Sequence, residues 1–141
     1  MSEERRLNPS FLEQALRQFD ASLTEYEKEP ERHANRDSVV IHFLLTYELS
    51  VQAIKRFVEL QSLKDSAGPD IGFQTIIRRA DALGVLRTGW PGFGRFREAR
   101  NAIAHTYDEQ KALSVVELAK EFADEARFLL EQLKRSLDDG E

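Results

Sequence analysis

Four side chains that could take part in chemistry lie close together in residues 100–107 (RNAIAHTY): Arg100, Asn101, His105 and Tyr107. An imidazole titrates in the range needed for a general acid or base, and a guanidinium group has a planar shape that matches phosphate. On a continuous helix Asn101 and His105 would share a face. Arg100 and His105 would be about 140° apart, so we expect the helix to end or bend near His105. The segment is a candidate anion site with a group able to move protons.

The local charge around this segment differs from that of the whole chain. The chain has a net charge of -5, which is unlike the basic character of a dedicated duplex-binding protein. Residues 78–107 hold six arginines against Asp81 and Glu98, a local balance of +4. Spacing alone nevertheless favours a plainer interpretation, in which the helix dipole favours His105 and Arg100 forms a surface ion pair.

Other kinds of site find little support in the sequence. The chain has no cysteine, which excludes disulfides, zinc-thiolate sites and cysteine nucleophiles. The glycines of residues 89–94 do not fit a phosphate-binding loop, and no His-Glu-x-x-His motif is present. We therefore expect no metal ion and no cofactor. His33 is expected to be exposed in a polar linker, and His42 to have a structural role.

Apolar periodicity predicts three helices before the candidate site. The first begins at Asn8-Pro9 and ends before Pro30. The second begins at Asp37 or Ser38 and fades over residues 62–69, a polar loop containing Gly68-Pro69. The third runs from about Gly72, with Leu83 among its inward-facing residues and Gly84 as its C-terminal cap.

Two further helices are predicted around and after the candidate site. Residues 88–92 are expected to form a loop, and the fourth helix follows it and ends with the candidate segment. Ser114 and Glu117 have the spacing of a capping box, which places the start of the fifth helix at Ser114. Phe122 belongs to the inner face of that helix. Tyr107 falls in a polar turn and should be exposed.

These elements predict one all-α domain spanning residues 1–141, with an ordered core at about 8–137, folded as an up-and-down bundle of four or five helices. No apolar run is long enough for a membrane span, and residues 1–6 lack the apolar core of a signal peptide. We expect a cytoplasmic protein with no membrane contact.

The pattern Arg-x4-His-x-Tyr, with a polar residue directly after the arginine, resembles the signature of the HEPN superfamily. Within it the chain is most similar to the nucleotidyltransferase substrate-binding proteins, which are related to HepT-type toxins. Further blocks of that family occur here in the same order, and together they span residues 8–137. They are Arg36-Asp37, Thr46-Tyr47-Glu48-Leu49, residues 80–86, Trp90, Arg100-Asn101 and residues 105–109.

The resemblance implies a metal-independent endoribonuclease. Arg100 would stabilise the phosphorane, His105 would act as base or acid, and Asn101 would orient the histidine or bind the phosphate. One histidine cannot easily make both proton transfers, so the resemblance also implies a two-fold homodimer with the fourth helix near its axis.

The resemblance further implies a minimal nucleotidyltransferase antitoxin as partner, which would attach AMP to Tyr107. The AMP would pair with Arg100, compete with the RNA phosphate and so block cleavage. Two alternatives remain open: a non-catalytic substrate-binding or partner subunit of a nucleotidyltransferase, and a helical adaptor without any site.

Overall fold

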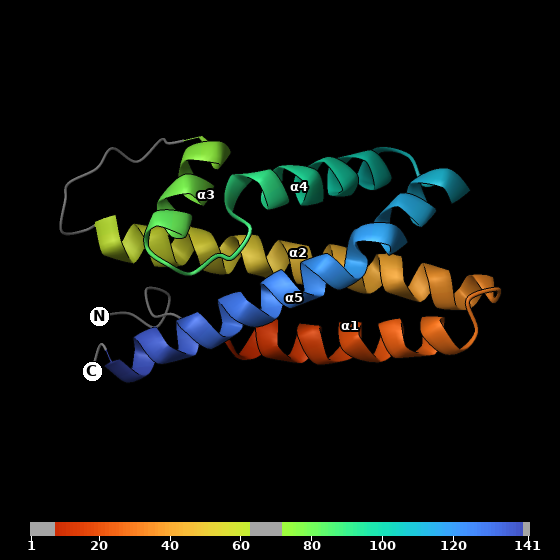
Figure 1. Cartoon of the computed structure of the whole chain (residues 1–141), viewed down its shortest axis with the longest axis horizontal. Coiled ribbons are helices and arrows are strands. Elements are labelled where there is room, and N and C mark those ends of the chain that lie inside the picture. Colours follow the sequence, from red (N-terminus) through yellow and green to blue (C-terminus); the bar gives the residue numbers. More distant parts are fainter. Residues whose placement is uncertain (1–7, 63–71, 140–141) are drawn as a thin grey trace.

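The computed structural model describes residues 8–62 and 72–139, and all regular structure in these ranges is helical. Figure 1 shows a bundle in which successive long helices run in opposite directions, with one short helix between them. The helices are α1 (Ser10–Lys28), α2 (His33–Ser62), α3 (Phe73–Ala82), α4 (Gly89–His105) and α5 (Glu109–Asp139). The predicted all-α bundle is confirmed. No helix in the described ranges is both long and apolar enough to cross a membrane.

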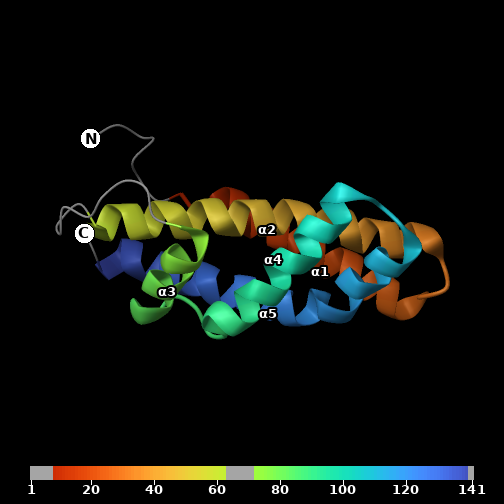
Figure 2. The same ribbon diagram turned by 90° about the horizontal axis from the view of Figure 1, so that it is seen from above.

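α2 lies at the centre of the arrangement and contacts each of the other four helices. Viewed from above, α4 crosses α2 obliquely, and its C-terminal end lies beside the first half of α2 (Figure 2). The core between the helices is rich in aromatic rings. Phe122 of α5 is fully buried, with ring centroids 5.1 Å from Phe96 and 5.2 Å from Phe43, so the predicted inner face of α5 is confirmed.

The connection between α1 and α2 is shorter than the sequence predicted. α1 begins at Ser10, whose backbone N–H donates to Asn8 Oδ1, and ends before Pro30 as expected. α2, however, begins at His33 rather than at Asp37 or Ser38, so His33 is exposed on a helix and not in a linker. The cause is Asn35, whose Nδ2 donates to the carbonyl oxygens of Glu25 (3.2 Å) and Glu29 (3.0 Å) and ties α2 to the end of α1.

The end of α3 is made by Gly84, as predicted. Its φ is +86°, and two backbone hydrogen bonds close the helix: Val85 N–H to Ala80 O, and Gly84 N–H to Asp81 O. The expectation that Leu83 lies inside is wrong, because the chain turns away there and Val85 and Leu86 take the buried positions. The predicted loop around Gly68-Pro69 lies outside the described residues.

α4 begins earlier than predicted, because a buried carboxylate organises the segment before it. Residues 89–92 are helical instead of forming a loop, and Pro91 is tolerated because first-turn N–H groups have no partner within the helix. Glu125 of α5, 1% exposed, accepts hydrogen bonds from the backbone N–H groups of Arg87 and Thr88 (both 2.8 Å) and from the Thr88 hydroxyl (2.5 Å). This negative charge lies next to the positive end of the α4 dipole.

The start of α5 also differs from the prediction. The helix begins at Glu109, and Asp108 Oδ1 accepts the backbone N–H of Lys111 at 2.8 Å, which is the bond of an N-cap residue. Ser114 lies inside the helix, and its hydroxyl donates to the carbonyl oxygen of Gln110. The early start leaves only a short turn between α4 and α5, and that turn contains Tyr107.

Candidate active site

The predicted site residues on α4 lie on its last two turns, at the protein surface. α4 continues as a helix to His105, so Asn101 and His105 share a face as predicted, and it ends there as expected. Arg100 Nη1 donates to Asn101 Oδ1 at 3.0 Å. Asn101 and His105 are exposed, and 40% of the Arg100 side chain is accessible. The three polar groups are therefore open to a ligand from solvent.

A single face of α2 flanks this part of α4. Asp37, Ile41, Leu45 and Glu48 follow one another at intervals of three or four residues and so share a face of the helix. Glu48 Oε2 lies 3.9 Å from Arg100 Nη2, and at the other end Asp37 contacts Tyr107. Between them Ile41 and Leu45 are 61% and 46% exposed. The site thus combines a polar edge on α4 with an exposed apolar stripe on α2.

Tyr107 lies in the turn between α4 and α5, and 51% of it is exposed, as predicted. Its hydroxyl donates a hydrogen bond to Asp37 Oδ1. Burial raises the pKa of the Tyr107 phenol, and the hydrogen bond to Asp37 and the charge of that carboxylate raise it further. The same hydrogen bond lowers the pKa of Asp37, and Arg36 adds to that effect.

Arg36 completes the cluster around Tyr107. Its Nε and Nη2 both lie 3.3 Å from Asp37 Oδ1, and its Nη1 lies 3.6 Å from Glu109 Oε1. Only 12% of the Arg36 side chain is accessible, so the surrounding residues hold the guanidinium in place. The arginine beside the phenol is therefore Arg36 of α2. Arg100 of α4 instead pairs with Glu48, which lies further along α2.

The two ends of the candidate segment contact α2 at separate points. Asp37 and Glu48 are 11 positions apart (48 minus 37), or about 16 Å along a helix that rises ~1.5 Å per residue. Arg100 and Tyr107, which the sequence placed in one motif, are therefore spread over about three turns of α2. His105 follows Arg100 and precedes Tyr107, so the imidazole belongs to the stretch between these two contacts.

The site predicted from the sequence did not include Arg36, Asp37 or Glu48. Their residue types gave no signal by themselves, because neighbouring Arg and Asp at the start of a helix are ordinary surface residues. The only indication was their place among the blocks of the resemblance. His42 has the expected structural position, with Nδ1 2.7 Å from the carbonyl oxygen of Ser38.

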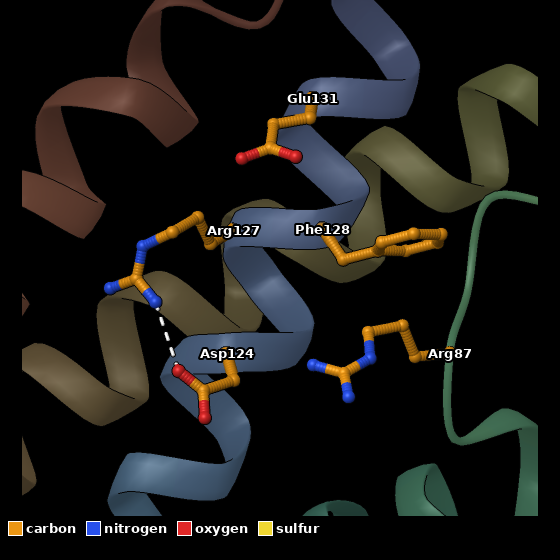
Figure 3. A pocket seen from close by; sticks show the side chains of 5 residues that line it. All are labelled: Arg87, Asp124, Arg127, Phe128 and Glu131. Carbon is orange, nitrogen blue, oxygen red and sulfur yellow. Dashed lines mark hydrogen bonds and ion pairs between the residues drawn. The ribbon is translucent and has the colours of Figure 1, made fainter.

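A shallow pocket of about 260 Å³ lies apart from these residues. It is formed by α5 and the segment before α4, and its lining consists of Arg87, Asp124, Arg127, Phe128 and Glu131 (Figure 3). Arg127 is already paired, with Asp124 at 3.0 Å and with Asp20 of α1 at 2.7 Å. The pocket contains none of the predicted site residues. Within residues 8–62 and 72–139, no group of three or more His, Asp or Glu side chains is arranged to hold a metal ion.

Comparison with known proteins connects this chain and its fold to one family. The family model described as nucleotidyltransferase substrate binding protein like matches residues 7–135. A curated relative from Haemophilus influenzae, described as "Probable ribonuclease HepT", is 34% identical over 95 residues. The match covers 66% of this chain and 63% of that protein, which is less than two thirds of its length.

A solved structure from the same organism has a similar fold. It is described as revealing the fold of a substrate-binding domain of a nucleotidyltransferase, and it superposes with a TM-score of 0.81 at 25% identity. The superposition covers 90% of this chain and 99% of that chain.

Proposed function

Since the chain belongs to the family of nucleotidyltransferase substrate-binding-like proteins, we propose that it is a HepT-type endoribonuclease, which cleaves RNA without a metal ion and is controlled by a minimal nucleotidyltransferase. The observation that carries the proposal is the accessibility of Arg100, Asn101 and His105 on the last two turns of α4, where Arg100 bonds to Asn101 and Asn101 shares a helix face with His105. These residues supply a phosphate-binding cation, an amide and a group able to move protons on one accessible stretch of helix.

The chemistry of these groups suits cleavage by the substrate's own 2′-hydroxyl. The 2′-oxygen attacks the adjacent phosphorus, the bond from phosphorus to the 5′-oxygen breaks, and a 2′,3′-cyclic phosphate remains. His105 would take the proton from the 2′-hydroxyl or give one to the leaving oxygen. Arg100 would pair with the phosphate in place of Glu48, and Asn101 would hold the guanidinium or the phosphate.

A two-fold homodimer would supply the second proton-transfer group. One His105 can act as base or as acid, whereas a second copy of α4 near a two-fold axis brings another Arg100-His105 pair. The exposed Ile41 and Leu45 support this arrangement, because apolar side chains on the face that flanks the site gain from burial against a partner. Gel filtration at micromolar concentration should show a dimer, and elution as a monomer would contradict this part of the proposal.

Control by the nucleotidyltransferase would act through Tyr107. AMP attached to the phenol places a phosphate charge and a nucleoside beside the cleavage site, where they compete with the RNA. The cation nearest to that phosphate would be Arg36, which lies next to Tyr107, and not Arg100 as the sequence predicted, because Arg100 pairs with Glu48 about three turns further along α2. Tyr107→Phe should leave cleavage intact and make it insensitive to the nucleotidyltransferase with ATP.

The test of the ribonuclease is His105→Ala, with His33→Ala as a matched control. Both histidines are exposed on helices, and only His105 belongs to the candidate segment. Cleavage of RNA in the presence of EDTA should be lost in His105→Ala and kept in His33→Ala, while both variants keep the helical circular dichroism spectrum of the wild type. Cleavage that requires magnesium and survives His105→Ala would contradict the mechanism.

A second candidate function is a non-catalytic substrate-binding or partner subunit of a nucleotidyltransferase. The description of the similar solved structure favours it, because that structure is described as a substrate-binding domain. Such a subunit would bind its nucleotidyltransferase with Arg100→Ala or His105→Ala as well as with the wild type, and none of the three would cleave RNA. A ribonuclease toxin would instead lose both cleavage and cell toxicity in these variants.

A further inference from the structure

The hydrogen bond between Tyr107 and Asp37 joins two parts of the chain that the sequence does not connect. Tyr107 lies after α4, Asp37 lies near the start of α2, and the two are 70 positions apart. Tyr107 remains half exposed, so a substrate can approach its oxygen while the hydroxyl hydrogen is directed to the carboxylate of Asp37. We propose that Asp37 is the catalytic base for nucleotidyl transfer to Tyr107, an inference that rests on the proposed control of this chain by a nucleotidyltransferase.

Asp37 is held in the ionised form that a base requires. Its Oδ1 accepts the hydrogen bond from the phenol and lies 3.3 Å from both Nε and Nη2 of Arg36. The hydrogen bond from Tyr107, followed by the hydrogen bond and charge of Arg36, lowers the pKa of the carboxyl group. Arg36 in turn pairs with both Asp37 and Glu109, and these contacts favour the position of the carboxylate beside the phenol.

The transfer step needs an acceptor for the phenolic proton. Tyr107 Oη attacks the α-phosphorus of ATP, the bond from that phosphorus to the oxygen bridging to the β-phosphate breaks, and pyrophosphate leaves with the electron pair. The phenol is protonated beforehand, as any tyrosine is at neutral pH, and burial and the neighbouring carboxylate raise its pKa further. As the new oxygen–phosphorus bond forms, the phenol becomes more acidic and its proton passes along the existing hydrogen bond to Asp37.

The same geometry distinguishes Tyr107 from the other two tyrosines. Tyr47 is buried, and burial raises its pKa to about 12, while Tyr26 is half-buried on α1. Among the described residues, Tyr107 is the tyrosine whose hydroxyl donates to a carboxylate. After the transfer, Tyr107 no longer donates a hydrogen bond to Asp37. Arg36, which lies beside both residues, can then pair with the new phosphodiester.

The experiment measures the rate of AMP attachment by intact-protein mass spectrometry. Wild type, Asp37→Asn, Asp37→Glu and Glu109→Gln are each incubated with ATP, magnesium and a minimal nucleotidyltransferase from the same genome. Glu109→Gln is the matched control, because it removes one carboxylate charge next to Arg36 without touching the phenol. Asp37→Asn preserves shape and removes basicity, and should slow the transfer roughly 100-fold or more. Asp37→Glu should keep part of the rate, and Glu109→Gln should stay close to wild type.

Each outcome decides between defined alternatives. AMP attachment to Asp37→Asn at the wild-type rate would overturn the role of Asp37 while leaving Tyr107 as the acceptor. Equal slowing in Asp37→Asn and Glu109→Gln would also overturn it, since the effect would then be one of charge alone. No AMP on the wild type would overturn the proposed control, and this inference with it. Thermal melting of every variant shows whether a slow rate reflects unfolding, and the rate of Asp37→Glu then decides whether a carboxylate is needed.

Discussion

The carboxylate of Glu125 should determine whether α4, which carries the candidate site, keeps its position. The informative substitution is Glu125→Gln, which preserves the size of the side chain. Oε2 of Glu125 accepts the N–H of Arg87, and Oε1 accepts both the N–H and the hydroxyl of Thr88. An amide can accept at one end only, so at least one of these donors would face an NH2 group.

The expected loss follows from burial and charge. A hydrogen bond to a charged group contributes about 1.5–3 kcal/mol, and a buried donor left without a partner costs about 1–3 kcal/mol. Glu125 is 1% exposed, so water cannot replace the missing acceptor. We therefore expect Glu125→Gln to lower the free energy of unfolding by about 2–4 kcal/mol.

The assay is urea unfolding followed by circular dichroism, with Glu121→Gln as the control. Glu121 lies one turn earlier on α5 and pairs with Arg95 at the surface, where an ion pair contributes about 0–1 kcal/mol. The two substitutions make the same chemical change on one helix and differ in burial. If Glu125→Gln cost no more than Glu121→Gln, the reasoning about the buried carboxylate would be refuted.

Three further predictions concern the core, the start of α4 and the phenol. Phe122→Ala should lower the free energy of unfolding by about 3–5 kcal/mol, since the ring is fully buried. Phe11→Ala is the control and should change it little, because Phe11 is 62% exposed; denaturant titration compares the two variants. Gly92→Ala should cost about 1–3 kcal/mol in the same assay, because its Cβ would lie 1.9 Å from the threonine hydroxyl that bonds the buried carboxylate. In an ultraviolet pH titration the pKa of Tyr107 should lie above 10.0 and fall in Asp37→Asn, because a neutral amide no longer favours the protonated phenol; an unchanged pKa would show that the contact is absent in solution.

One face of α2 contacts both ends of the candidate site. Glu48 at one end forms an ion pair with Arg100, and Asp37 at the other accepts a hydrogen bond from Tyr107. Ile41 and Leu45 are exposed between them. A ligand or second copy that covers this face would contact both the proposed cleavage residues and the proposed modification site. Cleavage and its control would then share one surface.

Much of the fold was predictable from the sequence because its cause is local. Apolar residues at helical spacing place α1 before Pro30, and Gly84 ends α3 because its positive φ suits glycine. The end of α4 at His105 and the exposure of Tyr107 follow from the change from an apolar pattern to a polar turn. In each case the determining residues lie within a few positions of one another.

Only the tertiary structure decides the features that depend on distant partners. α2 begins at His33 because Asn35 reaches the carbonyl groups at the end of α1, and α4 begins at Gly89 after a segment held by Glu125 of α5. The contact of Asp37 with Tyr107 spans 70 positions. No local spacing encodes these pairs, because side chains far apart in the sequence become neighbours only when the helices pack around the shared aromatic core.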